Sequence, residues 1–187
     1  MEDAMIIMKD IKPGVHFFGV FDGHGGDAVA LYVKKYLPSL IKTSKSLAQS
    51  NYERVFEEVF RKIDTMLDTK TAVDELRTIY KHGLCKDESE NGSNVNHAMQ
   101  SGTTACCALI TADKIYVGNL GDSRAVLAKI PGLHSSVGRD KLEAHEMSID
   151  MKPQNEEERK RIVEAGGSVI MGRVDGNLSL SGAIGDK

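Results

Sequence analysis

The sequence predicts an α+β fold, and three observations predict it. Two short apolar segments open the chain, amphipathic helical stripes follow them, and short apolar segments return after residue 101. Strands and helices that are grouped in this way, instead of alternating one by one, are typical of α+β layering. With 187 residues and an apolar fraction of 41%, the chain is long enough for one domain with a sizeable core.

The opening segments are the first predicted strands. "AMIIM", residues 4–8, and "HFFGVF", residues 16–21, are apolar and β-forming, as expected of buried strands. The second segment runs into "DGHGG", residues 22–26. Because glycine adopts backbone conformations that other residues avoid, these residues are expected to turn tightly into the next element.

Helical periodicity begins directly after these glycines. Apolar residues recur every three or four positions over 29–41 and again over 52–67, which predicts two amphipathic helices. Pro38 is expected to kink or end the first helix. A third, weaker helix is expected over 72–82. The polar and aperiodic segment 86–100 is expected to be a mobile loop.

Short strands are predicted again in the second half of the chain. "GTTACCALIT", "KIYVGNL" and "SRAVLAKI" are apolar, β-forming and separated by turn residues, so they predict an antiparallel meander. The segment 168–183 predicts a hairpin around an Asp175-Gly176 turn.

One further helix is predicted between these strands, over residues 155–167. Asn155 is a suitable N-cap, and Glu158 follows three residues later, as in a capping box. Gly166 and Gly167 are expected to end the helix.

Composition excludes several classes of partner. The net charge is -3, from 24 Lys and Arg against 27 Asp and Glu, so neither nucleic acid nor an anionic membrane is an expected partner. No apolar run is long enough for a membrane span, and the acidic N-terminus does not resemble a signal peptide. Cys106 and Cys107 are adjacent and are interpreted as free thiols, which predicts a cytoplasmic or nuclear protein.

Acidic residues lie at the ends of the first two predicted strands. If these strands are neighbours in a sheet, Glu2, Asp22 and the carbonyl of Gly23 converge. An all-oxygen cluster suits a hard cation such as Mg²⁺ or Mn²⁺, and His24 can exchange a proton near neutral pH. The alternative is a tight glycine turn with incidental polar residues. The motifs of dinucleotide-binding folds, P-loops and α/β-hydrolases are absent from the sequence.

Several further blocks occur together with this segment. They are "MEDA", "VFDGHGGDAVALYVKKYLP", "SGTTACCALI", "VGNLGDSRAV", "MSIDMKPQNEEERKRIVEAGGSV" and "GRVDGNLSLSGAIGD". In this order, and over nearly the whole chain, they resemble the metal-dependent serine/threonine protein phosphatases of type 2C. The residues around 147–185 most resemble the gamma-type members.

The resemblance implies a fold and a reaction. The fold is a central antiparallel β-sandwich flanked by helices, in four layers (α-β-β-α). Residues 1–187 would form one domain of this kind, truncated at its C-terminus. The implied activity is hydrolysis of phosphoserine and phosphothreonine in phosphoprotein substrates, through attack by a water that bridges two Mg²⁺ or Mn²⁺ ions.

The resemblance also implies roles for the acidic residues. Glu2, Asp22 and the carbonyl of Gly23 would be ligands of one catalytic metal, and Asp22 would bridge to the second. Asp3 would hydrogen-bond water on the metal. Asp150 would help to bind a further, weaker metal.

Two other positions match the family. His24 would be the general acid that protonates the leaving serine or threonine oxygen. Asp122 also matches a family position, and we interpret it as structural, in a tight turn between strands.

The sequence departs from the family pattern at four places. An arginine that usually precedes the "MED" block has no counterpart before Met1, Met151 replaces a histidine, and Gly182 replaces an arginine. The chain stops at Lys187, before a segment with two further aspartates, so the second metal site is expected to be incomplete. The alternative function is therefore a catalytically impaired, phosphatase-like fragment that acts as a metal-binding or partner-binding module.

Overall fold

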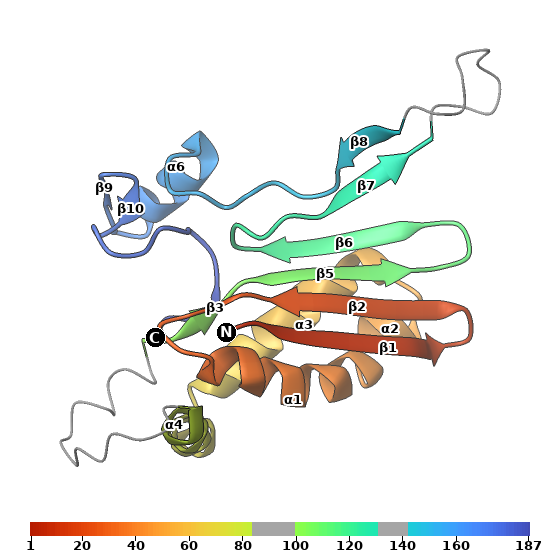
Figure 1. The fold of residues 1–187 in the computed structure, drawn as a ribbon, viewed down its shortest axis with the longest axis horizontal. Coiled ribbons are helices and arrows are strands. Elements are labelled where there is room, and N and C mark those ends of the chain that lie inside the picture. Colours follow the sequence, from red (N-terminus) through yellow and green to blue (C-terminus); the bar gives the residue numbers. More distant parts are fainter. Residues whose placement is uncertain (84–99, 131–141) are drawn as a thin grey trace.

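A four-stranded antiparallel sheet forms the centre of the structure (Figure 1). The computed structural model describes residues 1–83, 100–130 and 142–187. The strands lie in the order β1-β2-β5-β6. Their bounds are β1 Ala4–Lys12, β2 Val15–Phe21, β5 Ala105–Ile110 and β6 Ile115–Leu120. Antiparallel strands with helices confirm the α+β class.

The first half of the chain covers one face of this sheet with helices (Figure 1). Their bounds are α1 Ala28–Lys42, α2 Lys45–Ala48, α3 Tyr52–Leu67 and α4 Lys70–Gly83. The core lies between the two layers, where Phe17, Leu109 and Ile63 are fully buried. The three predicted helices are confirmed, and α2 was not predicted. Helix α1 continues through Pro38 to Lys42, so the proline does not end it.

A small sheet lies at one end of the main sheet and carries the candidate site. It contains β3 Gly23–His24, β4 Gly102–Thr103 and β11 Ile184–Gly185, in the order β11-β4-β3. The predicted strand at 102–111 is thus two strands, β4 and β5, which separate at Thr104. This break lets one chain segment belong to both sheets.

The second half of the chain forms smaller units. A hairpin of β7 Val126–Lys129 and β8 Glu143–Glu146 is followed by α6 Glu156–Glu164. A shorter hairpin pairs β9 Val169–Ile170 with β10 Arg173–Val174.

A turn forms at Asp175-Gly176 as predicted, but the strands that pair in this segment flank a different turn. Asp175 and Gly176 have φ values of 48° and 76°, and they form a turn closed by an isolated bridge between Val174 and Leu178. The paired strands β9 and β10 turn instead at Met171 and Gly172, which also have positive φ. A methionine in the left-handed region carries little turn signal, so the sequence did not indicate this turn.

Two other expectations concern the loop at 86–100 and membrane-spanning segments. The predicted loop at 86–100 lies outside the described residues except for Gln100. Among the helices in the described part of the chain, none combines the length and the apolarity that a membrane span needs.

Candidate functional site

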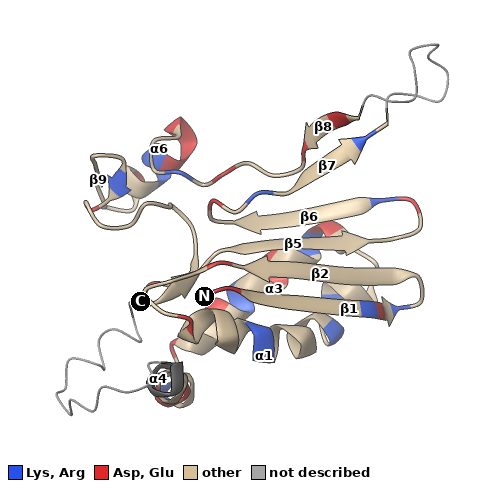
Figure 2. Ribbon diagram, in the orientation of Figure 1, with Lys and Arg blue, Asp and Glu red and all other residues tan. Residues whose placement is uncertain are grey.

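Strand pairing brings the acidic residues of the first two strands to one edge. β1 pairs with β2, and Ala4 lies opposite Phe21. Asp3 and Asp22 therefore leave the sheet side by side, and Figure 2 shows acidic residues beside the N-terminus and at the end of β2. Asp22 is fixed from both sides of its peptide, because its N–H donates to Thr104 Oγ1 at 3.1 Å and its carbonyl accepts from Thr104 N–H at 2.9 Å.

Glycine is needed where the chain leaves Asp22. A Cβ atom at Gly23 would lie 2.5 Å from the Glu2 carbonyl oxygen, so no larger residue fits without moving the backbone. The Gly26 N–H points toward Glu2 Oε2 at 3.4 Å. The structure thus places Glu2 beside Gly23 and Asp3 beside Asp22. Their roles as metal ligands stay a prediction.

His24 is held by a carboxylate that the sequence analysis did not single out. His24 Nε2 lies 2.8 Å from Asp186 Oδ1 and 2.9 Å from Oδ2. The small sheet causes this contact, because His24 pairs with Gly102 and Gly102 pairs with Gly185. A Cβ at Gly102 would lie 2.5 Å from His24 Nε2 and 2.6 Å from both Asp186 carboxylate oxygens.

The electrostatics of the site follow from this crowding of acids. The hydrogen bond to Asp186 raises the pKa of His24, and the charges of Asp22 and Asp122 act in the same direction. Burial raises the pKa of Asp22, and the carboxylates of Asp3 and Asp122 raise it further. The site therefore favours a protonated imidazole and holds more negative charge than its own cations balance.

This donor set fits a hard divalent cation. The side chains at the edge are carboxylates, which Mg²⁺ and Mn²⁺ prefer, and the mutual repulsion around Asp22 is what a bound cation would relieve. Within 1–83, 100–130 and 142–187, no three His, Cys, Asp or Glu side chains already stand in an arrangement that could hold a metal ion.

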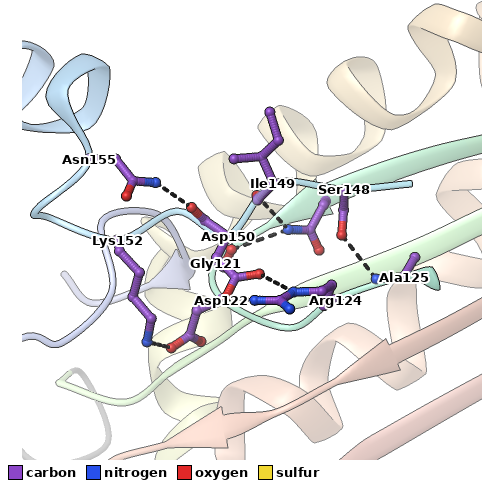
Figure 3. A network of polar contacts seen from close by, with 10 residues as sticks. Gly121, Asp122, Arg124, Ala125, Ser148, Ile149, Asp150, Lys152 and Asn155 are labelled. Atoms are coloured by element: carbon purple, nitrogen blue, oxygen red, sulfur yellow. Dashed lines mark hydrogen bonds and ion pairs between the residues drawn. The ribbon is translucent and has the colours of Figure 1, made fainter. Parts of the chain in front are cut away.

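Asp150 belongs to a neighbouring network (Figure 3). Its two carboxylate oxygens accept from Arg124 Nε and Nη2, both at 2.9 Å, and this pairing lowers the pKa of Asp150. Lys152 forms an ion pair with Asp122 in the same network. The structure links Asp150 to the acidic edge through the turn 121–125, and the weak-metal role remains a prediction.

The same network explains why the predicted capping box does not form. Asn155 precedes α6 but makes no side-chain cap hydrogen bond. Its Nδ2 instead donates to the Asp150 carbonyl at 2.7 Å, and Glu158 pairs with Arg161 at 2.6 Å. A contact to the preceding loop and an i, i+3 ion pair within α6 therefore occupy the two side chains.

Two acids near the site were given no functional role from the sequence, Asp186 and Asp122. Asp186 lay in a matched block but received no role, and Asp122 was interpreted as structural only. Both follow a glycine with a φ of 98°, Gly185 and Gly121. An acid directly after a glycine at a strand end is the shared signal, and it mirrors the Asp22-Gly23 pair.

Two departures from the family pattern meet in space. A Cβ at Gly182 would lie 2.7 Å from Met151 Sδ and 3.0 Å from Leu120 Cδ1. Met151 therefore occupies the volume beside Gly182. The glycine that replaces the family's arginine and the methionine that replaces its histidine are in contact with each other.

Comparison with known proteins gives a consistent result. The family model "Protein phosphatase 2C" matches residues 1–187. "Probable protein phosphatase 2C 6" of Paramecium tetraurelia is 42% identical over 186 residues, which are 100% of this chain and 55% of that protein. "Protein phosphatase 2C 1" of the same organism is 41% identical and is covered to 54% of its length. The chain thus spans about half the length of these relatives.

Solved structures share the fold. A serine-threonine phosphatase 2C from Toxoplasma gondii has a TM-score of 0.61 and 22% identity, covering 100% of this chain and 63% of that chain. A C. elegans sex determining protein has a TM-score of 0.66 and 24% identity, covering 99% of this chain and 40% of the other. With the family model matched from the first residue to the last, the chain belongs to the protein phosphatase 2C family.

Proposed function

We propose that the chain is the site-bearing part of a protein serine/threonine phosphatase that depends on Mg²⁺ or Mn²⁺. The observation that supports this most is the contact between His24 and Asp186 beside the carboxylates of Asp3 and Asp22. Hydrolysis of a phosphomonoester is extremely slow without catalysis. It needs charge neutralisation, an activated water and an acid for the departing alkoxide.

The chain's residues match these needs. Glu2, Asp22 and the Gly23 carbonyl would hold the cation, which supplies charge neutralisation and activation of water when bound. Asp3 would orient that water by accepting a hydrogen bond. His24 would donate its proton to the leaving serine or threonine oxygen. Its raised pKa keeps the imidazole protonated nearer to neutral pH, as a general acid requires.

A leaving-group comparison tests the role of His24. A threonine alkoxide needs a proton to depart, whereas nitrophenolate does not. With Mn²⁺ present, His24→Gln is expected to slow phosphate release from a phosphothreonine peptide by about 100-fold or more and to slow nitrophenyl phosphate hydrolysis much less. Equal loss on both substrates would contradict the acid role.

A measurement of Mn²⁺ binding, combined with the turnover assay, separates the phosphatase from the alternative function. Mn²⁺ binding is measured by electron paramagnetic resonance in the parent chain and in Asp22→Asn. Binding together with turnover supports the phosphatase. Binding that Asp22→Asn abolishes, from folded protein without turnover, would leave the chain a metal-binding module.

A further inference from the structure

The segment that carries Asp186 is clamped by the end of helix α3. Asp64 Oδ1 accepts from the Gly185 N–H at 3.0 Å, and its Oδ2 accepts from Lys187 Nζ at 2.8 Å. Asp68, one turn later, lies 3.3 Å from the same ammonium. One carboxylate of α3 therefore holds both neighbours of Asp186.

These acids stand at the unfavourable end of their helix. The last turn of α3 contains no basic residue, and its C-cap is Asp68. A carboxylate near a helix C-terminus is destabilising on its own, because it meets the negative end of the helix dipole. An acidic residue at this unfavourable position of a helix usually makes a contact elsewhere in the fold. Here the contact is with the segment 185–187.

The clamped segment has an unusual backbone that needs such support. Gly185 has a φ of 98° and Asp186 a φ of 55°, so two consecutive residues lie in the left-handed region. Only a few residue types tolerate that region, and a non-glycine residue there is held by its surroundings. The Asp186 N–H donates to the Ser101 carbonyl at 3.1 Å. Fully buried Ile184 anchors the segment on the other side.

We propose that Asp64 is a positioning residue of the candidate site, which fixes Gly185 so that the carboxylate of Asp186 reaches His24 Nε2. The inference rests on the proposed function, because it assumes that His24 and Asp186 serve the reaction. Asp64 itself would not touch substrate. Its carboxylate acts through the Gly185 N–H, and Lys187 neutralises the carboxylate.

Three substitutions separate the two contacts of Asp64. Asp64→Asn keeps an amide oxygen that can accept from the Gly185 N–H but loses the attraction to Lys187. Asp64→Ala removes both contacts, and Asp64→Glu displaces the carboxylate by one methylene. Asp68→Asn is the matched control, since Asp68 meets Lys187 and not Gly185.

The first measurement does not depend on turnover. Imidazole nitrogen shifts of His24 are recorded by NMR at one pH, with Asp186→Ala as the reference for the lost contact. Asp64→Ala and Asp64→Glu are expected to move the His24 shifts toward those of Asp186→Ala, whereas Asp64→Asn and Asp68→Asn stay near the parent. Parent-like shifts in Asp64→Ala and Asp64→Glu would overturn the proposal. If Asp64→Ala does not fold, Asp64→Glu alone decides.

Turnover provides the second measurement. With a phosphothreonine peptide and Mn²⁺, Asp64→Ala is expected to lower kcat by about 10- to 100-fold, because small displacements of reacting groups are costly, while KM changes little. Asp64→Asn is expected to restore most of the rate. A parent without turnover contradicts the proposed function only, and the His24 shifts still decide on Asp64.

Discussion

At the scale of single residues, the site depends on a side chain that is missing. Gly102 lies between His24 and Gly185 in the small sheet. Because it has no Cβ, the imidazole and the Asp186 carboxylate can meet across it. Its φ is not positive, so the requirement is for space and not for a special backbone conformation.

Gly102→Ala is therefore expected to separate His24 from Asp186. The added methyl would stand 2.5 Å from the imidazole nitrogen and 2.6 Å from the carboxylate, so one of them must move. We expect phosphate release to fall by at least about tenfold with little change in melting temperature. The control is Gln100→Ala, whose side chain is exposed. Full activity of Gly102→Ala would show that the contact has no part in the reaction.

The residues of the site were predictable to different degrees. Asp22 and His24 stand in one short segment, so the sequence alone brought them together. Asp186 reaches His24 through β11, β4 and β3, which are far apart in the chain and only two residues long each. Strands this short have no periodicity to recognise, so their pairing could not be predicted.

Among the secondary-structure elements, the short helix α2 is stabilised by one acidic residue of α3, Glu58. α2 has only four residues, Lys45–Ala48, which is too short to persist without tertiary contacts. Glu58 of α3 accepts from Ser44 Oγ at 2.9 Å and from the N–H groups of Lys45 and Ser46 at 3.0 Å each. These bonds satisfy the free donors at the start of the helix.

The charge of Glu58 should appear in the pH dependence of stability. Hydrogen bonds from Ser46, with those from Ser44 and Lys45, lower the pKa of Glu58 from 4.5 to about 2. A lowered pKa in the folded state stabilises the protein fully above the unfolded value of 4.5 and less as the pH falls toward about 2.

Glu58→Gln is accordingly expected to cost about 1 kcal/mol of unfolding free energy near neutral pH, in the range of lost helix caps. Urea unfolding should show this difference unchanged from pH 7 to 5 and shrinking below about pH 4.5. Glu57→Gln is the control, since Glu57 is exposed and pairs only with Arg61 among the described residues. A difference that grows on acidification would contradict the capping role.

The contact between α3 and the sheet has an equally local requirement. A Cβ at Gly118 of β6 would lie 2.2 Å from Cγ of Phe56, whose aromatic ring projects from α3 and is buried. Gly118→Ala is therefore expected to cost about 1–3 kcal/mol in urea unfolding, as overpacked cores do. The cost should be smaller in a Phe56→Ala background, and equal costs in both backgrounds would show that the ring is not the obstacle.

Among the helices of the first half of the chain, those with a long periodic pattern were predicted and α2 was not. α1 and α3 each have 15 residues or more and a clear apolar stripe, so periodicity was sufficient. α2 is held by Glu58, and the Met171-Gly172 turn lies against Gln154, whose Nε2 a Cβ at Gly172 would meet at 2.4 Å. Neither contact leaves a local trace in the sequence.

At the scale of the whole molecule, one face of the main sheet is apolar and open. Cross-strand pairing aligns Ile7, Phe18, Ala108 and Val117 in a row across all four strands. Ile7 is 54% exposed, and no described helix lies over this face (Figure 1). Charged residues lie mostly at the strand ends (Figure 2). Exposed apolar patches of this kind promote association.

The chain alone is therefore expected to associate as its concentration rises and to bind an apolar dye. Ile7→Thr should reduce both effects without loss of stability, as measured by light scattering after gel filtration and by dye fluorescence. Its neighbour Ile6 faces the helices and is 5% exposed, so Ile6→Thr should instead destabilise by about 1–3 kcal/mol. A strictly monomeric chain that binds no dye would contradict this view of the face.

The acidic edge at Asp22 is proposed to support phosphate release. Its most direct test is the rate of phosphate release from a phosphothreonine peptide under Mn²⁺, for the parent chain and for Asp22→Asn. Asp113→Asn, in an exposed turn, is the control, and EDTA sets the background. We predict release in the parent and in Asp113→Asn, with loss by about 100-fold or more in Asp22→Asn. Equal rates in the parent and Asp22→Asn, or background rates from folded parent protein, would contradict the account.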